Sequence, residues 1–103
     1  MQNRKNNTKK KIAVLLATYN GEKFLRSQID SILKQNDVDI QIVISDDKSS
    51  DESLEIIQSL CKQDNSVSCI NKSRMGGPAK IFYYLVNHIN HKHFDNIALW
   101  KFY

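Results

Sequence analysis

The sequence contains little glycine, proline or cysteine and no long apolar run. Its 103 residues include 3 Gly, 1 Pro and 2 Cys, which excludes collagen-like chains and disulfide-rich scaffolds. No stretch of about 18 apolar residues occurs, so no membrane-spanning helix is predicted. The cysteines, Cys61 and Cys69, fit no CxxC spacing and are expected to be buried free thiols. The missing GxGxxG and GxxxxGK[ST] motifs exclude dinucleotide oxidoreductases and P-loop NTPases. One soluble domain is predicted.

The net charge of +4 is concentrated at the N-terminus. Five of the 15 basic residues precede Ile12, with no acid among them: Arg4, Lys5, Lys9, Lys10 and Lys11. The rest of the chain has 10 basic and 11 acidic residues. The body is therefore not basic enough to favour a nucleic-acid partner. Residues 1–11 are expected to form a flexible, solvated tail, with attraction to an anionic membrane surface as the alternative. They lack the apolar region of a secretory signal, which predicts a cytoplasmic protein, the inner membrane face being the alternative location.

Apolar runs alternate with amphipathic segments along the chain. Buried strands are expected at 12–17, 40–45, 67–70 and 96–99, and helices at 22–35, at 52–62 and from Pro78 onward. Asp51 is expected to be the N-cap of the second helix. This order, βαβαβαβ, predicts an α/β fold with a doubly wound, mostly parallel sheet.

Polar segments follow three of these strands. Thr18–Gly21 follows the first, Asp46 and Asp47 follow the second, and Asn71–Gly77 follows the third. Ligands of doubly wound sheets bind at the carboxyl ends of the strands, so a site is predicted here. A carboxylate can accept hydrogen bonds from a base or ribose, and Tyr19 can stack on a base. The alternative for the acid pair is turn and cap chemistry before the helix.

Three segments together resemble a known family. LLATYNGEKFL, IVISDDKSSD and NKSRMGGPAKIF resemble the opening half of a family 2 glycosyltransferase, over roughly residues 12–99. The resemblance implies the Rossmann-like half of a GT-A fold, with residues 12–103 as a donor domain, incomplete at its C-terminus, that binds a UDP or dTDP sugar. It also implies a role in surface polysaccharide or lipid-linked glycan synthesis.

The resemblance assigns nucleotide contacts to all three polar segments. The loop after the first strand contacts the pyrimidine and ribose, Asp46 contacts the uracil ring beside Asp47, and the third loop borders the diphosphate. The residues concerned are Ala17, Thr18, Tyr19, Asn20, Glu22, Asp46, Asp47, Arg74, Gly76, Gly77 and Lys80.

The chain departs from the family pattern at its end. The family has an acidic motif after the fourth strand that holds Mg²⁺ or Mn²⁺, whereas here NIAL is followed by Trp100, Lys101, Phe102 and Tyr103. Lys48 and Ile81 replace a common Gly and Asn. No metal ligand and no catalytic base is predicted, and the three histidines are expected to form a cationic cluster rather than a metal site. The chain is therefore expected to be a truncated transferase half that is inactive alone.

Two other classes of protein compete with this interpretation. One is a non-catalytic α/β module that binds a nucleotide or a partner. The other is a signalling receiver domain, which also has an acidic pair on a doubly wound sheet. A receiver's acids follow the first strand, whereas here that strand ends in ATYNG and the acids follow the second. The position of the acids favours the transferase.

Overall fold

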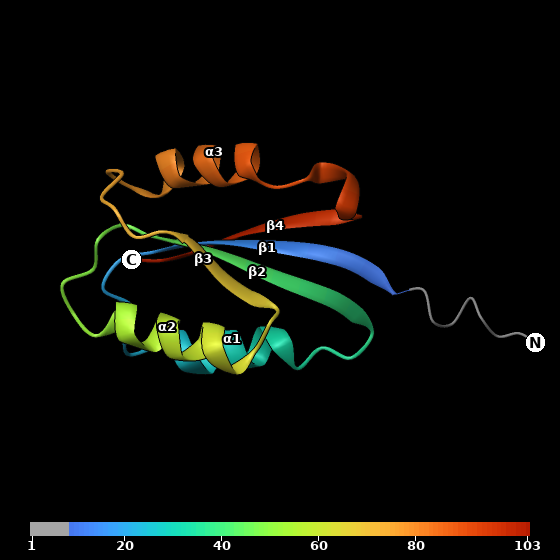
Figure 1. The fold of residues 1–103 in the computed structure, drawn as a ribbon, viewed down its shortest axis with the longest axis horizontal. Helices are drawn as coiled ribbons and strands as arrows, with labels where there is room; N and C mark the ends of the chain where they lie inside the picture. Colours follow the sequence, from blue (N-terminus) through green and yellow to red (C-terminus); the bar gives the residue numbers. More distant parts are fainter. Residues whose placement is uncertain (1–8) are drawn as a thin grey trace, which may run out of the picture.

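The structure, a computed structural model, describes residues 9–103. Its elements are β1 (Lys10–Thr18), α1 (Leu25–Leu33), β2 (Val38–Asp46), α2 (Ser53–Gln63), β3 (Val67–Asn71), α3 (Pro78–His88), a 3₁₀ turn η2 (His91–His93) and β4 (Asn96–Phe102). The predicted alternation of strands and helices is confirmed. Figure 1 shows it as a single sheet between layers of helices.

All strand pairs of the sheet are parallel. The strand order is β3-β2-β1-β4, with β1 paired to β2 on one side and to β4 on the other. The run IAVLLA lies within β1, where Ala13 to Thr18 are all buried. A strand that is covered on both faces reads as a continuous apolar run, which explains why this segment becomes the centre of the sheet.

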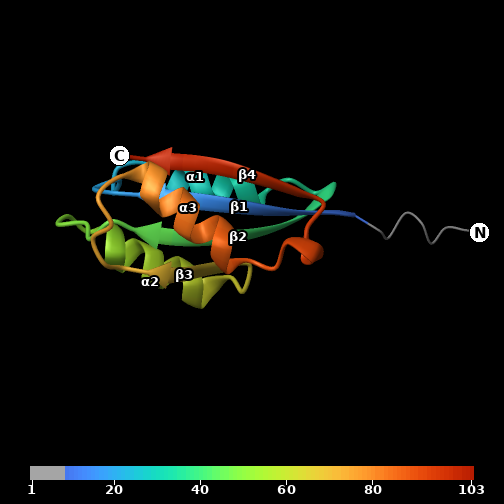
Figure 2. The same ribbon diagram turned by 90° about the horizontal axis from the view of Figure 1, so that it is seen from above.

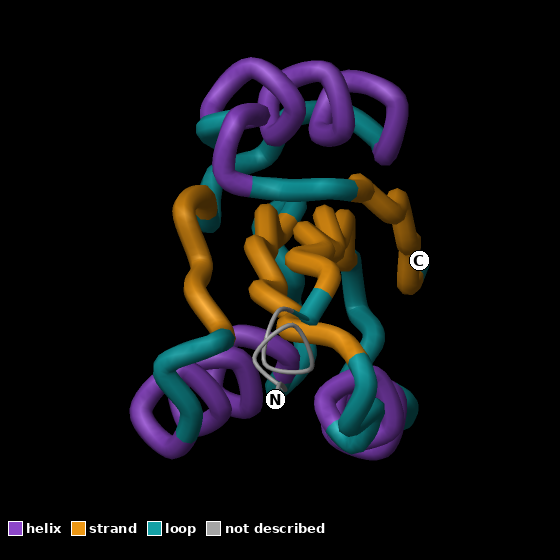
Figure 3. Tube along the Cα trace, turned by 90° about the vertical axis from the view of Figure 1, so that its right-hand side faces the viewer, coloured by secondary structure: helices purple, strands orange, loops and turns teal. Residues whose placement is uncertain are grey.

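Helices cover both faces of the sheet. Helices α1 and α2 lie on one face and α3 lies on the other, as Figures 1 and 2 show. Seen along the strands in Figure 3, the sheet separates the two helical layers. Ile29 of α1 and Ile57 of α2 pack with Leu16 on the first face. On the second face, Leu85 of α3 packs against Leu15. Each such burial contributes roughly 1.5 to 3 kcal/mol.

Several boundaries differ from the predicted ones. Strand β1 begins at Lys10, so Lys10 and Lys11 belong to the sheet rather than to a tail that ends at residue 11. Of the rest of the expected tail, Lys9 precedes the strand, and residues 1–8 lie outside the described residues. Helix α1 begins only at Leu25, after a turn in which the Gly21 N–H donates a hydrogen bond to the Ser53 hydroxyl at the start of α2.

The second helix and the fourth strand also need correction. Helix α2 begins at Ser53 with Glu52 at the N-cap position. The Asp51 carboxylate nevertheless accepts a hydrogen bond from the Ser53 N–H at 2.9 Å, one residue outside the expected position. Strand β4 continues three residues past Leu99, to Phe102, since it follows β1 as far as Thr18. Within residues 9–103, no helix combines the length and apolarity required to traverse a bilayer.

Candidate functional site

The loops after β1 and β2 meet at the carboxyl edge of the sheet. The Asp47 N–H donates to the Thr18 carbonyl at 2.8 Å, and the Tyr19 N–H donates to the Phe102 carbonyl at 2.8 Å. These bonds continue the pattern of the sheet one residue beyond the strands. Tyr19 and Asp47 are therefore held at fixed positions on the edge where ligands of such sheets bind.

Side chains connect the loop after β1 with the start of α2. Asn20 has a positive φ of 52°, a conformation that asparagine tolerates better than most residues. Its Oδ1 accepts the Ser50 N–H at 2.8 Å and the Asp51 N–H at 3.3 Å. Glu22 makes a similar contact with the next residue of that segment, since its Oε1 accepts the Glu52 N–H at 3.1 Å. Asn20 and Glu22 thus stabilise the loops that carry the site.

The Asp47 carboxylate is enclosed by donors from the third loop. Its Oδ1 accepts the N–H groups of Met75 and Gly76, the latter at 3.0 Å, and its Oδ2 accepts the Gly77 N–H at 2.9 Å. The Tyr103 hydroxyl donates to the same Oδ2 at 3.0 Å. Burial alone would raise the pKa of Asp47, but these donors lower the pKa to about 2. Asp47 is therefore a fixed negative charge.

Two glycines make this arrangement possible. Gly76 and Gly77 have φ values of 87° and 118°, in the region that residues with a Cβ rarely adopt. This backbone conformation directs successive N–H groups toward Asp47. Pro78 then begins α3, where its missing N–H costs no hydrogen bond. The sequence GGP thus positions both the carboxylate and the N-terminus of the helix.

Asp46 has a different environment. Its side chain is fully buried, and its two oxygens accept the N–H and the hydroxyl of Ser49, both at 2.7 Å. Burial raises the pKa of Asp46, and the Ser49 hydrogen bonds oppose this only in part. The neighbouring acids Asp51 and Asp47 raise it further. Asp46 therefore shapes the turn after β2 and does not face the open edge.

A small pocket opens at this edge beside Asp47. Its volume is about 290 Å³, and it is lined by Tyr19, Asp47, Arg74, Gly76, Gly77 and Tyr103. The Tyr19 and Tyr103 rings lie with centroids 5.9 Å apart and planes inclined by 36°. An aromatic face, a carboxylate and a guanidinium thus meet in one pocket. These groups offer stacking, hydrogen-bond acceptance and attraction for an anion.

The structure brings together only some of the predicted site residues. Tyr19, Asp47, Arg74, Gly76 and Gly77 line the pocket. The remaining predicted residues do not line it: Ala17, Thr18, Asn20, Glu22, Asp46 and Lys80. Ala17 packs beneath α3 in the core, and the buried Thr18 hydroxyl finds no partner among residues 9–103. A Cβ placed on Gly76 would lie 3.8 Å from the Lys80 Nζ, so Lys80 lies beside the pocket.

Tyr103 and two serines are site residues that the sequence reasoning missed. Tyr103 lines the pocket because β4 runs parallel to β1 as far as Phe102, which places the next residue beside Tyr19. Extending the fourth strand through its aromatic residues would have revealed this neighbour. The Ser49 hydroxyl donates a hydrogen bond to the buried Asp46. The Ser53 hydroxyl accepts one from Gly21 in the first loop. Their small hydroxyl side chains after an acid pair were the available signal.

The carboxylates at this edge do not form a set of metal ligands. No three His, Cys, Asp or Glu side chains gather around a potential metal position in the described part of the chain. Asp46 and Asp47 instead accept hydrogen bonds from protein donors. Of the histidines, His88 and His91 each have a ring nitrogen 2.7 Å from a backbone carbonyl of the α3 segment. The residues present therefore do not fit Mg²⁺ or Mn²⁺.

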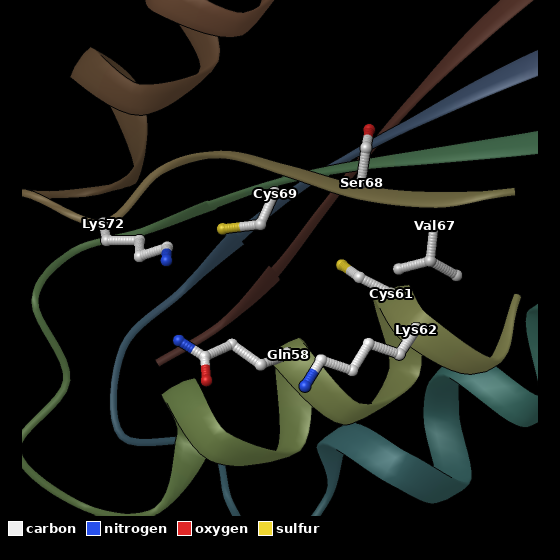
Figure 4. Close-up of a pocket in the computed structure, with 7 residues that line it drawn as sticks. All are labelled: Gln58, Cys61, Lys62, Val67, Ser68, Cys69 and Lys72. Carbon is white, nitrogen blue, oxygen red and sulfur yellow. The ribbon is translucent and has the colours of Figure 1, made fainter. Parts of the chain in front are cut away.

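A larger cavity lies elsewhere, between α2 and the edge strand β3. Its volume is about 430 Å³, and Figure 4 shows the thiols of Cys61 and Cys69 with Lys72 around it. Burial raises the pKa of both thiols, whereas Lys72 lowers it in part. Both cysteines are free, as expected, but they are only partly buried. No residue of this cavity belongs to the predicted site.

The chain folds into an α/β domain with a parallel sheet and a pocket at the carboxyl edge of that sheet, and the comparisons with known proteins identify its family. The family model "Glycosyl transferase family 2" matches residues 13–94. The chain therefore belongs to glycosyl transferase family 2.

Individual relatives agree with this assignment. The dTDP-rhamnosyl transferase RfbG of Shigella flexneri is 40% identical over 85 residues, which cover 81% of this chain and 29% of the relative. The GalNAc(5)-diNAcBac-PP-undecaprenol beta-1,3-glucosyltransferase of Campylobacter jejuni is 35% identical over 69 residues, covering 66% and 22%. The chain thus spans less than a third of the length of these relatives.

A solved structure confirms the GT-A fold. The mannosyltransferase PcManGT of Pyrobaculum calidifontis, in complex with GDP-Man and Mn²⁺, superimposes with a TM-score of 0.70. The match covers 82% of this chain and 26% of that protein, at 16% sequence identity. The predicted Rossmann-like half of a GT-A fold is confirmed.

Proposed function

We propose that the chain binds the nucleotide part of a sugar donor, a UDP or dTDP sugar, in the pocket beside Asp47. The observation that carries the proposal is the meeting of Tyr19, Asp47 and Arg74 in one pocket at the carboxyl edge of the sheet. Membership of glycosyl transferase family 2 supports a nucleotide sugar as the ligand. The Shigella relative is named a dTDP-rhamnosyl transferase, which supports testing dTDP donors.

Each group of the pocket has a distinct role in this proposal. The Tyr19 ring stacks on the base, and the Asp47 carboxylate accepts a hydrogen bond from a base N–H or a ribose hydroxyl. Asp47 replaces Asp46 as the contact for the base, because Asp46 is fully buried against Ser49. The positive charge of Arg74 attracts the diphosphate.

The start of α3 supports the same position for the diphosphate. Lys80 lies beside Gly76, and α3 begins at Pro78, directly after the loop that surrounds Asp47. The N-terminus of a helix carries a partial positive charge that favours phosphate groups. Because the N–H groups of Gly76 and Gly77 already donate to Asp47, cationic side chains are the main phosphate contacts in this proposal.

The proposal is limited to donor binding. The chain spans less than a third of the length of its relatives, so we propose that these 103 residues bind the donor without transferring the sugar alone. The glycan built by the pathway, surface polysaccharide or lipid-linked glycan, is part of the same proposal. So is a cytoplasmic location, with peripheral membrane attachment through the basic N-terminal residues as the alternative.

Isothermal titration calorimetry with UDP, dTDP and uridine tests donor binding. Arg74→Ala should weaken UDP binding about tenfold, as expected for a hydrogen bond to a charged group, and should leave uridine binding nearly unchanged. Arg26→Ala removes another exposed arginine, on α1 and outside the pocket, and is the matched control. Equal UDP affinity for the wild type and Arg74→Ala, or no binding of any nucleotide, would contradict the proposal.

A further inference from the structure

Tyr103 occupies the part of the pocket where a stacked ring would lie. Its ring is a neighbour of the Tyr19 ring, with centroids 5.9 Å apart. Carbon atoms in contact are about 3.5 Å apart, so a further ring between the two tyrosines would need about 7 Å. A base cannot enter between them. A base can stack on the side of the Tyr19 ring that is next to Tyr103 only after Tyr103 has moved.

Tyr103 also presents the chemistry expected of a base. Its hydroxyl donates to Asp47 Oδ2 at 3.0 Å, while its aromatic ring lies against Tyr19. A uracil or thymine base would offer the same two features, an aromatic face and an N–H donor. Each would therefore replace both contacts of Tyr103 rather than leave the Asp47 oxygen without its donor.

Tyr103 is free to move away. Half of its surface is exposed, in contrast to the buried Asp47. It follows Phe102, the last residue of β4 to pair with β1, so its side chain can rotate without breaking the sheet. Rotamer changes of exposed side chains are fast. The three N–H groups of the third loop continue to hold Asp47 when Tyr103 leaves.

We propose that Tyr103 is an internal competitor for the base, which admits only ligands that combine an aromatic ring with a hydrogen-bond donor for Asp47. This inference rests on the proposed function. Because the competent pocket is open only part of the time, the apparent affinity for the ligand is reduced by that fraction. Removing the ring removes the competition.

The test measures UDP binding to the wild type, Tyr103→Phe and Tyr103→Ala by titration calorimetry. Tyr103→Ala should bind UDP about tenfold more tightly than the wild type, as for a pocket that is open about a tenth of the time. Tyr103→Phe loses only the hydrogen bond and should lie between the two. Tyr83→Ala is the matched control, because Tyr83 is an exposed tyrosine of α3 outside the pocket, and its UDP affinity should equal that of the wild type.

A second ligand tests the requirement for a donor. UDP methylated at N3 has no N–H for Asp47 and should bind Tyr103→Ala about tenfold more weakly than UDP does. Nuclear Overhauser contacts between Tyr19 and Tyr103 should disappear when UDP saturates the wild type. Circular dichroism spectra would confirm that all variants fold.

The outcomes separate this inference from the proposed function. If Tyr103→Ala binds UDP as tightly as the wild type or more weakly, or if the tyrosine contacts persist in the complex, the competition is refuted while donor binding stands. Equal affinity for UDP and its N3-methyl form refutes the donor requirement. If neither the wild type nor Tyr103→Ala binds any nucleotide, the proposed function and this inference both fail.

Discussion

The backbone N–H of Gly21 donates a hydrogen bond of 2.9 Å to the buried hydroxyl of Ser53. The bond joins the loop after β1 to the first residue of α2. Gly21 has little space around it, since a Cβ at this position would lie 3.2 Å from the Thr18 Oγ1 and 3.3 Å from the Phe102 Cβ. The close approach of Gly21 and Ser53 therefore fixes the first loop beneath the pocket.

Replacing Ser53 by alanine should destabilise the fold. Ser53→Ala leaves the buried Gly21 N–H without an acceptor, and such a loss typically costs about 1 to 3 kcal/mol. The measurement is the free energy of unfolding in urea. Ser59→Ala changes a partly buried serine on the same helix; this variant is the control and should change stability by less than about 0.5 kcal/mol. Similar values for the two variants would contradict this role of Ser53.

The charge of Asp47 should make stability depend on pH in the acid range. Its pKa is lowered from 3.8 to about 2, so its contribution, about 2 kcal/mol, is fully present above about pH 4 and is lost as the pH falls toward 2. Urea unfolding at pH 2 to 5 measures the effect. The pKa of Asp51 is also lowered, whereas the pKa of Asp46 is raised. The comparison with Asp47→Asn therefore isolates the contribution of Asp47. Parallel stability curves for the two proteins would show that the donors around Asp47 add nothing.

Removing the Thr18 hydroxyl should not weaken the protein. This hydroxyl is buried without a partner among residues 9–103, so Thr18→Val removes an unsatisfied polar group and should raise the free energy of unfolding by about 1 kcal/mol. The contrasting variant is Ser45→Ala. The Ser45 hydroxyl accepts a hydrogen bond of 3.1 Å from the Asn71 amide, and its loss should lower stability. Destabilisation by Thr18→Val would indicate that the hydroxyl has a partner in solution, such as water.

The exposed edge of the sheet should cause self-association. Among residues 9–103, strand β4 pairs only with β1, and Leu99 and Trp100 on it are 52% and 40% exposed. Exposed apolar edge strands favour pairing with other chains. Sedimentation velocity should show association that increases with concentration and is reduced by Leu99→Lys. Tyr83→Lys adds the same charge at an exposed site on α3 and should have little effect. A wild-type monomer at every concentration would contradict this prediction.

Sequence reasoning recovered the fold better than the site. The apolar run before Thr18 identified the central strand, because a strand covered on both faces has no polar alternation. The alternation of strands and helices predicted a parallel sheet, which is confirmed. The reach of β4 was underestimated by three residues, and Tyr103 was consequently missed.

The roles within the acid pair depend on geometry that a sequence does not reveal. Asp46 and Asp47 are adjacent and identical in type, yet the strand directs one toward Ser49 in the interior and the other toward the third loop. Side chains alternate between the two faces of a strand, which predicts that they diverge. Which of them lines the pocket depends on the positive φ values of Gly76 and Gly77, and these values could not be inferred from the spacing.

The central position of β1 has a consequence for how the chain is made. Strand β1 is synthesised before its two neighbours, and β4 is synthesised after the other three strands. Ribosomes add roughly 5 to 20 residues per second, so on the order of ten seconds separate the synthesis of Thr18 from that of Asn96. During this interval the side of β1 that later pairs with β4 presents free N–H and C=O groups between strongly apolar side chains. Unpaired strand edges of this kind favour aggregation, so delays in translation between α3 and β4 would prolong the period in which the nascent chain can aggregate.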